Sequence, residues 1–585
     1  MNARLLITLS LLCLPATGYA AASHSISEIR TLIASAAAAH AKRVVIPPGV
    51  YRGGLASGNA VILPIQNIDD LKIVAKDVLM VCTMRTRAVE FDNCRNVEME
   101  GLRIDYDPLT FTQGTVTATA PDKSWIDVTL DAGYPRMPFS RIDVVDPHTR
   151  FRVHGMPFLW GTKAALVKPN VVRVTLKGIG DAAPVGSLTS LNDGNEAGGV
   201  CHGIDLENCK GGMVLRDVTL YCAPGMGIVE HGGAGGTRLL GVRIVPGPTP
   251  AGAAEPRLLT TSWDGILHAA VRKGPDVENC RIEDCGDDSW SDQSGPMLVV
   301  KSQDNQVVLA GGSTLLPGDR ICRSLASSPL RVLSVRTVPI NQAGLDSDTM
   351  EKLDKAPQWT LWAVDHQTVQ VATLDSASSH DVGTSFYSPD NQGNGFIFRN
   401  NYVYSSGRLL IKASDGLIEG NTLIDGHNVV VDPEVAAGAA FGIENIAFRD
   451  NTVIGVDNSC NAPWSSQAGA FSGVAGAIEN GKKTFAAAGN FVNFDIEDNT
   501  FEDVAGVSIA LAGVQGAKLL GNKFIKPHSE TLSNSGADYG IDQAAVIFLR
   551  NCKAVTLKGN KVVAPGRYEK RVLDDNATNS NSTDH

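Results

Sequence analysis

The sequence lacks the features that would mark several common protein classes. Aromatic residues make up only 6% of the chain, and no block of lysine or arginine interrupts a net charge of −11. The absence of a basic block argues against nucleic acid as a partner. The cysteines form no Cys-x-x-Cys pair, so no structural metal site is expected, and no cofactor is predicted. After residue 22, no apolar run is long enough to predict a membrane span in the mature chain.

The first 22 residues predict a signal peptide. Arg4 provides the positive charge, Leu5–Leu14 form the apolar stretch, and small residues up to Ala22 fit a cleavage site. The alternative, a membrane anchor, needs a longer apolar run. We therefore expect an exported protein, either periplasmic or extracellular.

The residues that are abundant predict a large fold rich in β-structure. The chain has 585 residues, of which 43% are hydrophobic, and it contains 59 glycines. This length allows a large core and more than one domain. Many glycines with few aromatic residues favour stacked strands and turns over helices.

A repeat of short strands around an asparagine supports this view. Its anchors are Asn401, Asn421, Asn451, Asn499, Asn522 and Asn560, in steps of 20, 30, 48, 23 and 38 residues. Steps of 20–23 residues fit one coil of three strands, and the longer steps indicate loops or a second coil. We expect these asparagines to adopt left-handed turns and to bond from coil to coil. A β-sandwich or a propeller would also give many short strands but does not explain the repeated asparagine.

The predicted fold is therefore all-β: a right-handed parallel β-helix with two inserted small antiparallel β-barrel or sandwich domains. The insertions are stretches of alternating strands without the asparagine repeat. A capping box at Ser25 and Glu28 predicts a helix that covers the first coil. Four Asn-Cys dipeptides suggest small buried positions rather than crosslinks. The predicted segments are 1–22 signal peptide, 23–106 cap and first coils, 107–200 inserted domain, 201–296 coils with an aspartate cluster, 297–390 second inserted domain, 391–566 C-terminal coils and 567–585 disordered tail.

Three aspartates stand at the spacing of one coil. Asp264 precedes the adjacent pair Asp287 and Asp288 by 23 and 24 residues. Strands in successive coils lie about 4.8 Å apart, so the three carboxylates should cluster. Their mutual repulsion should raise at least one pKa, and one raised and one ordinary carboxyl is what acid–base hydrolysis requires. Single turn aspartates often only cap backbone groups.

The aspartate pattern resembles that of the inverting polygalacturonases of glycoside hydrolase family 28. Longer segments resemble glycoside hydrolase family 110, the inverting exo-α-1,3-galactosidases that include enzymes acting on blood group B. They include IDYDPLTFTQGTV (104–116), TSWDGILHAAVRKGP (261–275), CGDDSW (285–290) and SSGRLLIKASDGLIEGNT (405–422). The resemblance implies a β-helix with β-barrel insertions. It also implies that Asp264, Asp287 and Asp288 are catalytic. The geometry that the site shares with the polygalacturonases favours Asp287 as the general acid, with Asp264 and Asp288 holding and deprotonating the water; the alternative exchanges the roles of Asp287 and Asp288.

Further residues are candidates for substrate binding. Arg408 and Lys412 could bind sugar hydroxyls or steady an aspartate, or they could form a solvated pair on the surface. Trp263 and Trp290 flank the aspartates and could stack on sugars or pack in the core. Glu230, His268 and Glu434 are the remaining candidates for the pocket.

The sequence thus predicts an exported inverting glycosidase that removes terminal α-1,3-linked galactose from oligosaccharides or glycoconjugates. A homodimer is possible. One alternative is a polygalacturonase-like hydrolase or a polysaccharide lyase, which usually needs Ca²⁺. The other is a non-catalytic solenoid that binds carbohydrate.

Overall fold

A computed structural model gives the fold of the chain. It describes residues 23–585 except 154–157, 194–200, 295–296, 312–313, 324, 326, 354–367, 378–379, 427, 433–441, 457–468, 480–481, 529–540, 542, 565, 567–569, 576–580 and 583–585. The predicted signal peptide, residues 1–22, lies outside the described residues. Among the described residues, no helix has the length and apolar character needed to cross a membrane.

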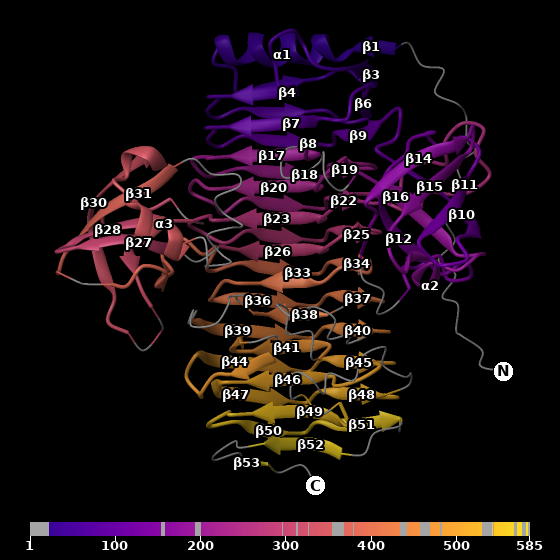
Figure 1. The fold of residues 1–585 in the computed structure, drawn as a ribbon. Helices are drawn as coiled ribbons and strands as arrows, with labels where there is room; N and C mark the ends of the chain where they lie inside the picture. The colour runs from indigo at the N-terminus through magenta and orange to yellow at the C-terminus, as the bar shows by residue number, and fades with distance from the viewer. Residues whose placement is uncertain are drawn as a thin grey trace.

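Three long parallel sheets form the body of the molecule (Figure 1). Each coil contributes one strand to each sheet, and each sheet is named here by its first strand. The β4 sheet contains β4 (Val61–Gln66), β7 (Arg87–Asp92), β17 (Ile204–Glu207), β20 (Ile228–His231), β23 (Ile266–Ala269), β26 (Trp290–Gln293), β35 (Leu409–Ile411), β38 (Val429–Val431), β41 (Phe471–Val474), β46 (Ile509–Ala512), β49 (Ala545–Arg550) and β52 (Lys570–Asp575).

The other two sheets complete the coils. The β2 sheet contains β2 (Arg43–Val45), β5 (Lys72–Val74), β8 (Glu98–Glu100), β18 (Val214–Arg216), β21 (Arg238–Leu240), β24 (Asp276–Glu278), β33 (Ile397–Arg399), β36 (Gly416–Glu419), β39 (Ile443–Arg449), β44 (Phe491–Glu497), β47 (Val514–Leu520), β50 (Thr556–Lys558) and β53 (Asn581–Ser582). The β1 sheet contains β1 (Ser23–Ser25), β3 (Gly49–Gly53), β6 (Val78–Cys82), β9 (Arg103–Tyr106), β19 (Thr219–Leu220), β22 (Arg243–Ile244), β25 (Arg281–Glu283), β34 (Tyr402–Tyr404), β37 (Thr422–Ile424), β40 (Thr452–Ile454), β45 (Thr500–Glu502), β48 (Lys523–Ile525) and β51 (Lys561–Ala564). This is a parallel β-helix, as predicted.

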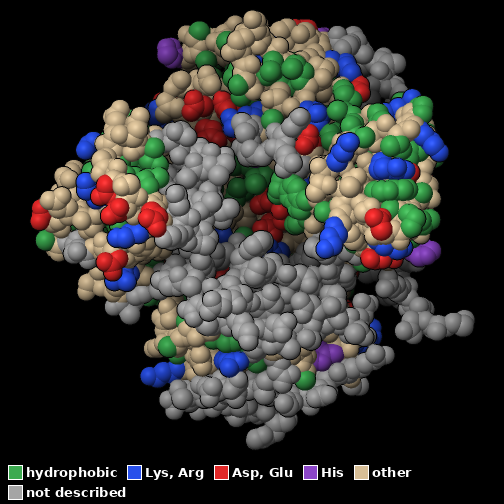
Figure 2. Space-filling model, in the orientation of Figure 1, with side chains coloured by type: hydrophobic (Ala, Val, Ile, Leu, Met, Phe, Trp, Pro, Cys, Tyr) green, Lys and Arg blue, Asp and Glu red, His purple; other side chains and the backbone are tan. Residues whose placement is uncertain are grey.

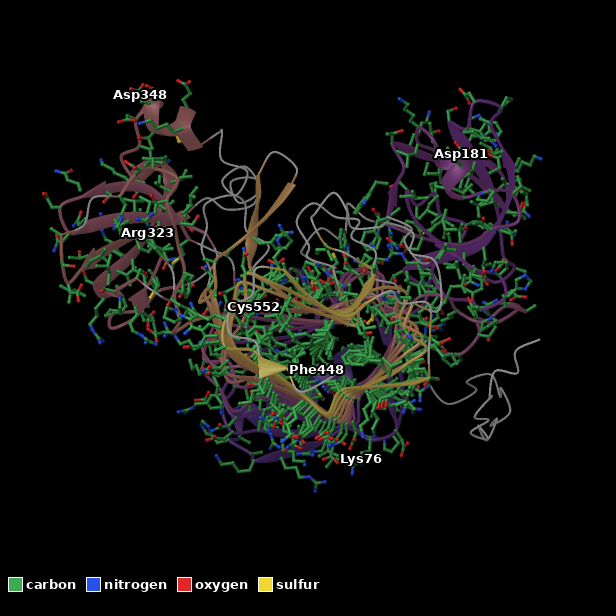
Figure 3. All side chains as sticks on the ribbon, turned by 90° about the horizontal axis from the view of Figure 1, so that it is seen from below. Lys76, Asp181, Arg323, Asp348, Phe448 and Cys552 are labelled. Atoms are coloured by element: carbon green, nitrogen blue, oxygen red, sulfur yellow. The ribbon has the colours of Figure 1, made fainter. Side chains whose placement is uncertain are left out.

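The core runs along the inside of the coils. Alternate residues of each strand point inward, so in-register side chains stack from coil to coil. In the β4 sheet, Ile228, Ile266, Trp290 and Leu409 are in register and buried. Seen along the axis, the interior is filled by side chains that include Phe448 (Figure 3).

The helix α1 (Ile26–Ala38) covers the first coil (Figure 1). Ser25 and Glu28 form the predicted capping box. Ile26, Ile29 and Ile33 are buried on its inner face. The helix therefore seals an end of the solenoid that would otherwise expose apolar core and unpaired strand edges.

The six predicted asparagines form a continuous ladder in the turns between the β2 and β1 sheets. Each backbone N–H from Asn401 to Asn522 donates to the Oδ1 of the next asparagine at 2.9–3.1 Å. Each side-chain amide also donates to a main-chain carbonyl at 2.8–3.0 Å. The prediction that the side chains bond from coil to coil is confirmed.

The expected backbone conformation of these asparagines was wrong. The positive φ belongs to the preceding residue in each turn: Asn400, Gly420, Asp450, Asp498, Gly521 and Gly559. The ladder asparagine has to turn its amide inward, where it is buried. The chain reversal therefore falls on the exposed neighbour, for which Asn, Asp or Gly is the least strained choice.

The Asn-Cys dipeptides obey the same rule. Asn93, Asn208, Asn279 and Asn551 have positive φ, and the cysteine after each is buried. The N–H of Cys280 donates to Asn401 Oδ1 at 2.8 Å, so this cysteine occupies the ladder position one coil earlier. The cysteines of the described part of the chain are free thiols. The dipeptides therefore mark small buried positions, as predicted.

Both insertions are antiparallel sheets that flank the solenoid on opposite sides (Figure 1). The first contains β10 (Phe111–Thr119), β11 (Trp125–Leu130), β12 (Arg141–Val145), β13 (Leu159–Trp160), β14 (Lys163–Lys168), β15 (Val171–Thr175), β16 (Leu188–Asn192) and the short helix α2 (Ile179–Ala182). The second contains β27 (Met297–Gln303), β28 (Gln306–Ala310), β29 (Arg320–Ile321), β30 (Leu330–Pro339), β31 (Thr368–Leu374), β32 (Ser385–Phe386), the 3₁₀ helix η1 (Ile340–Gln342) and α3 (Ser347–Leu353). A hairpin of β42 (Gly476–Glu479) and β43 (Lys482–Phe485) is a further addition to the C-terminal coils.

The C-terminal segment predicted as a tail contains two strands among its described residues. The strand β52 continues the β4 sheet, and β53 continues the β2 sheet. The last coil offers open strand edges, and an added strand satisfies their backbone groups.

Candidate functional site

Asp264, Asp287 and Asp288 lie at the start of two adjacent strands of the β4 sheet. Ile266 of β23 is in register with Trp290 of β26, so Asp264 and Asp288 stand one above the other. The N–H of Gly265 donates to the carbonyl of Asp288 at 2.8 Å and holds the two turns together. One oxygen from each of the three carboxylates lies within 4.8 Å of the others. The coil spacing therefore produces the cluster that the sequence predicted.

Asp288 is paired with Arg408, which directly precedes β35 in the next coil. Arg408 Nε donates to Asp288 Oδ1 at 2.6 Å, and a terminal nitrogen donates to Oδ2 at 2.9 Å. Asp288 is 5% exposed. A two-point bond of this kind fixes the orientation of the carboxyl group and places a positive charge beside it. Of the three readings given for Arg408, these contacts show the pairing with an aspartate.

Asp264 is placed so that it favours the protonated form. It is buried, and Ser291 Oγ donates to its Oδ2 at 3.0 Å. Burial, followed by the charges of Asp288 and Asp287, raises the pKa of Asp264 well above that of an ordinary aspartate. Ser291 and Arg408 act in the opposite direction. The cluster therefore holds a proton at a pH where isolated aspartates have lost theirs.

Asp287 is the least buried carboxyl of the three. Burial, together with the charge of Asp288, raises the pKa of Asp287 to about 6. Arg141, Arg408 and Arg152 lower it again, so the shift stays moderate. Asp287 thus combines access to solvent with a pKa close to neutral, and these are the properties of a general acid.

Arg141, in β12 of the first inserted domain, ties both aspartate turns together. Its guanidinium is fully buried and donates to the carbonyl oxygens of Ser262 and Gly286. Ser262 lies two residues before Asp264, and Gly286 directly precedes Asp287. One side chain from the inserted domain therefore fixes the relative position of the two turns and places a positive charge beside them.

Aromatic rings surround this guanidinium. Its central carbon lies 4.3 Å from the ring centre of Phe158, 4.6 Å from Trp263 and 5.4 Å from Trp160. Such distances are typical of cation–π contacts. Phe158 and Trp160 belong to the inserted domain, whereas Trp263 directly precedes Asp264. The interface between domain and solenoid is thus aromatic beside the aspartates.

The surface is hollowed between the two inserted domains (Figure 2). Acidic and apolar side chains meet at the floor of this hollow. A separate small pocket is lined mainly by apolar side chains, including Leu409, Leu423 and Val453, and none of its lining groups titrates. We assign the chemistry to the carboxylate cluster, since the apolar pocket offers no acid or base.

Three predicted binding residues lie inside the solenoid instead of on its surface. Trp290 is fully buried and packs against Phe396 and Phe398, with ring centres 5.4 and 4.8 Å apart. His268 and Glu230 are also buried, with His268 Nδ1 2.8 Å from Glu230 Oε2. The reason is the two-residue period of a strand: Ile266 and Ile228 point inward, and so do the residues two positions later. Sugar binding was the wrong prediction for these three side chains.

The remaining candidates have different outcomes. Trp263 lies beside the cluster and is half-buried. Lys412 follows β35 and is half-buried, and its N–H donates to the carbonyl of Asp292 at 2.8 Å. Glu434 lies outside the described residues.

Sequence reasoning missed the residues that come from elsewhere in the fold. Arg141, Arg152, Phe158 and Trp160 lie more than 100 residues before the aspartates in sequence. The inserted domain does not share the period of the coils, so sequence spacing cannot relate its residues to the aspartates. These residues are found only from the way the domain packs on the solenoid. Ser291 could have been identified from the sequence, because it stands three residues after Asp288 on the outward face of β26.

Comparisons with known proteins identify no family. No protein-family model matches the chain, and no curated protein matches it. Among solved structures, the catalytic unit of an α-1,3-glucanase of family GH87 from Streptomyces thermodiastaticus is 12% identical with a TM-score of 0.36, over 97% of this chain and 69% of the other. The A-module of a mannuronan C-5 epimerase from Azotobacter vinelandii is 9% identical with a TM-score of 0.36, over 96% and 98%. A family 28 exopolygalacturonase from Yersinia enterocolitica is 12% identical with a TM-score of 0.36, over 91% and 73%. Likenesses this low carry no functional argument, so function has to be argued from the site.

Proposed function

We propose that the protein is a glycoside hydrolase in which Asp287 is the general acid and Asp288 the base. The observation that supports this most directly is the unequal surroundings of three adjacent carboxyls. Asp288 is paired with Arg408 through both oxygens, whereas Asp287 has no such pair among the described contacts and its pKa is raised to about 6. A proton donor and a proton acceptor within 4.8 Å of each other are the two groups that glycoside hydrolysis requires.

In the proposed reaction, Asp287 protonates the glycosidic oxygen as the bond to the anomeric carbon breaks. Asp288 accepts a proton from a water molecule, and the oxygen of that water bonds to the anomeric carbon. Each oxygen of Asp288 has a lone pair beyond the one that binds Arg408, so it can still accept. Asp264 and Ser291 position the water. Asp288 is thus the base and Asp264 orients the water, whereas the prediction from the sequence assigned both roles to the two residues jointly.

The finer assignment rests on the resemblance to glycoside hydrolase family 110. By that resemblance the substrate is a terminal α-1,3-linked galactose, and the product has inverted configuration. Inverting enzymes usually separate their carboxyls by about 6.5–9.5 Å and retaining enzymes by about 5–5.5 Å. The nearest oxygens here lie within 4.8 Å, so the spacing does not decide the stereochemistry. NMR of the first-formed sugar decides it: β-galactose supports inversion, and α-galactose contradicts it.

The substrate class is tested with nitrophenyl glycosides and α-galactosyl oligosaccharides. We expect turnover of α-galactosides by the wild type and loss of turnover in Asp264→Asn and Asp288→Asn. Asp503→Asn is the matched control, because Asp503 is an exposed turn residue that contacts Lys526 at 3.6 Å. Normal turnover in Asp288→Asn would refute its role as the base.

The role of the acid is tested with a leaving group that needs no proton. Asp287→Asn should lose most activity on an α-galactosyl disaccharide but keep much of it on α-galactosyl fluoride. Asp288→Asn should lose activity on both, since water still has to be deprotonated. Equal losses of Asp287→Asn on the two substrates would remove it from the acid role.

A second candidate function follows from the same cluster. Three carboxylate oxygens within 4.8 Å could also hold a divalent cation, as in Ca²⁺-dependent lyases of this fold. Arg408 binds both oxygens of Asp288, and Arg141 and Arg152 add positive charge near Asp287, which opposes cation binding. Dialysis against EDTA separates the two functions. Unchanged activity supports the hydrolase, and loss that Ca²⁺ restores supports the lyase.

A further inference from the structure

We propose that the first inserted domain forms the leaving-group subsite, with Trp160 and Trp263 as a platform on which a sugar ring stacks. The proposal rests on the proposed function, because it needs Asp287 as the acid. It adds a substrate-binding surface and assigns a role to the insertion.

The platform is assembled from two separate parts of the chain. Trp160 lies in β13 and is paired across the sheet with Arg141 of β12. Trp263 lies in the turn that carries Asp264. The two ring centres are 5.4 Å apart and the planes are tilted by 43°. The guanidinium of Arg141 lies against both rings and fixes them relative to the turns.

Exposure distinguishes Trp160 from a core residue. Its surface is 38% exposed, whereas that of Trp290 in the solenoid is 0% exposed. Leaving the apolar surface of an indole in water forgoes about 25 cal/mol of burial free energy for each Å². Packing against Arg141 already holds Trp160 at the aspartate turns, so its open surface is available to a ligand without rearrangement. Sites that bind small molecules commonly combine aromatic surfaces with a few polar groups in this way.

The platform shares its anchor with the turn of the proposed acid. Arg141 donates to the carbonyl of Gly286, which directly precedes Asp287, as well as to that of Ser262 in the Asp264 turn. The platform is therefore fixed relative to Asp287. An acid delivers its proton to the oxygen that departs with the leaving group, so a ring stacked beside Asp287 belongs to that group.

The chemistry of the platform indicates a neutral ring. The two terminal nitrogens of Arg141 are committed to main-chain carbonyls, and the indole faces carry no formal charge. A pyranose ring with its C–H groups turned to the indole fits these surfaces.

The experiment compares two substrates that differ only in the leaving group. Steady-state kinetics are measured for wild type and Trp160→Ala on an α-galactosyl disaccharide and on α-galactosyl fluoride, which has no ring to stack. We expect kcat/KM on the disaccharide to fall about ten-fold, mainly through KM, with the fluoride value within about two-fold of wild type. Trp160→Phe should restore most of the loss, because a phenyl ring still stacks.

Trp125→Ala is the matched control. Trp125 lies in the same inserted domain, but its ring packs against Arg173 at 3.6 Å. Equal losses on both substrates in Trp160→Ala would overturn the subsite and show an indirect effect through the aspartate turns. Unchanged kinetics on both would also overturn it and leave the hydrolase intact. Failure of the wild type to hydrolyse either substrate would overturn the proposed function and the subsite together.

Discussion

At the scale of single residues, the site depends on how three identical side chains are made different. Asp288 is paired with a guanidinium, Asp264 accepts a hydrogen bond from a hydroxyl, and Asp287 is partly open to solvent. Three identical side chains within 4.8 Å of one another therefore stand in three different electrostatic surroundings. This difference gives two predictions.

The first concerns the pH dependence of activity. A general acid has to be protonated, so activity falls as pH rises through its pKa. Since the pKa of Asp287 is about 6, kcat/KM should decline above about pH 6. The measurement is a pH profile of kcat/KM on the disaccharide. A flat profile from pH 5 to 9 would contradict Asp287 as the acid.

The second concerns the stability cost of Asp287. The folded pKa of about 6 lies above the 3.8 of an ordinary aspartate, so the folded state binds the proton more tightly. The stability contributed by that proton is present below about pH 4 and is lost as pH rises to about 6. At pH 8, Asp287→Asn should therefore raise the free energy of unfolding, by up to roughly 3 kcal/mol. Denaturation at pH 8 and pH 4 tests this, and a gain of equal size at both values would point to another cause.

At the scale of elements, the turns define the register of the coils more than the strands do. A three-residue strand alone does little to define the register between coils. The asparagine that follows it, such as Asn451, accepts from a backbone N–H of the preceding coil and donates to a carbonyl of that same coil. Buried polar groups of this kind are costly to leave unpaired. The ladder therefore fixes the register of the coils that carry Arg408.

This gives a prediction for Asn451, which accepts from Asn421 and donates to Asn499 and to the carbonyl of Ile418. Asn451→Ala leaves these partners unsatisfied and should lower the free energy of unfolding by roughly 2–4 kcal/mol. Asn490 makes one bond, to the carbonyl of Ala487 at 3.2 Å, so Asn490→Ala should cost less than about 0.5 kcal/mol. Thermal unfolding of both variants provides the comparison, and equal effects would refute the role of the ladder.

At the scale of the whole molecule, the candidate site combines the solenoid with an inserted domain docked onto it. The first domain is fastened by Gln113 of β10, which donates to the carbonyl of Pro256 and accepts from the N–H of Leu258, both at 3.0 Å, and by Arg141 at the aspartate turns. The second is fastened by Arg272 and Asp319, at 2.7 and 2.9 Å. The solenoid provides the carboxylates and their direct partners Arg408 and Ser291, and Arg141 of the first domain holds the two aspartate turns together.

The anchoring of both aspartate turns by Arg141 gives a prediction. Arg141→Met removes the charge that lowers the pKa of Asp287, so the decline of activity should move to higher pH. Loss of the two anchoring bonds should also lower kcat/KM about ten- to a hundred-fold. Arg141→Lys keeps the charge and should keep the pH profile. Arg173→Met is the control, since Arg173 pairs with Asp127 within the same domain, and a shifted profile there would exclude a specific role for Arg141.

The sequence by itself determined the β-helix, its two insertions and the aspartate cluster. A solenoid repeats its contacts at a nearly fixed interval, so residues 24 apart, such as Asp264 and Asp288, become neighbours. It also determined the asparagine ladder, because the same turn recurs in successive coils. Only the tertiary structure decided which candidates face outward: His268, Glu230 and Trp290 point into the core because of a strand phase that the spacing did not reveal. It alone brought Arg141 and Trp160 to the site, because docking of an inserted domain follows from surface complementarity and leaves no period in the sequence.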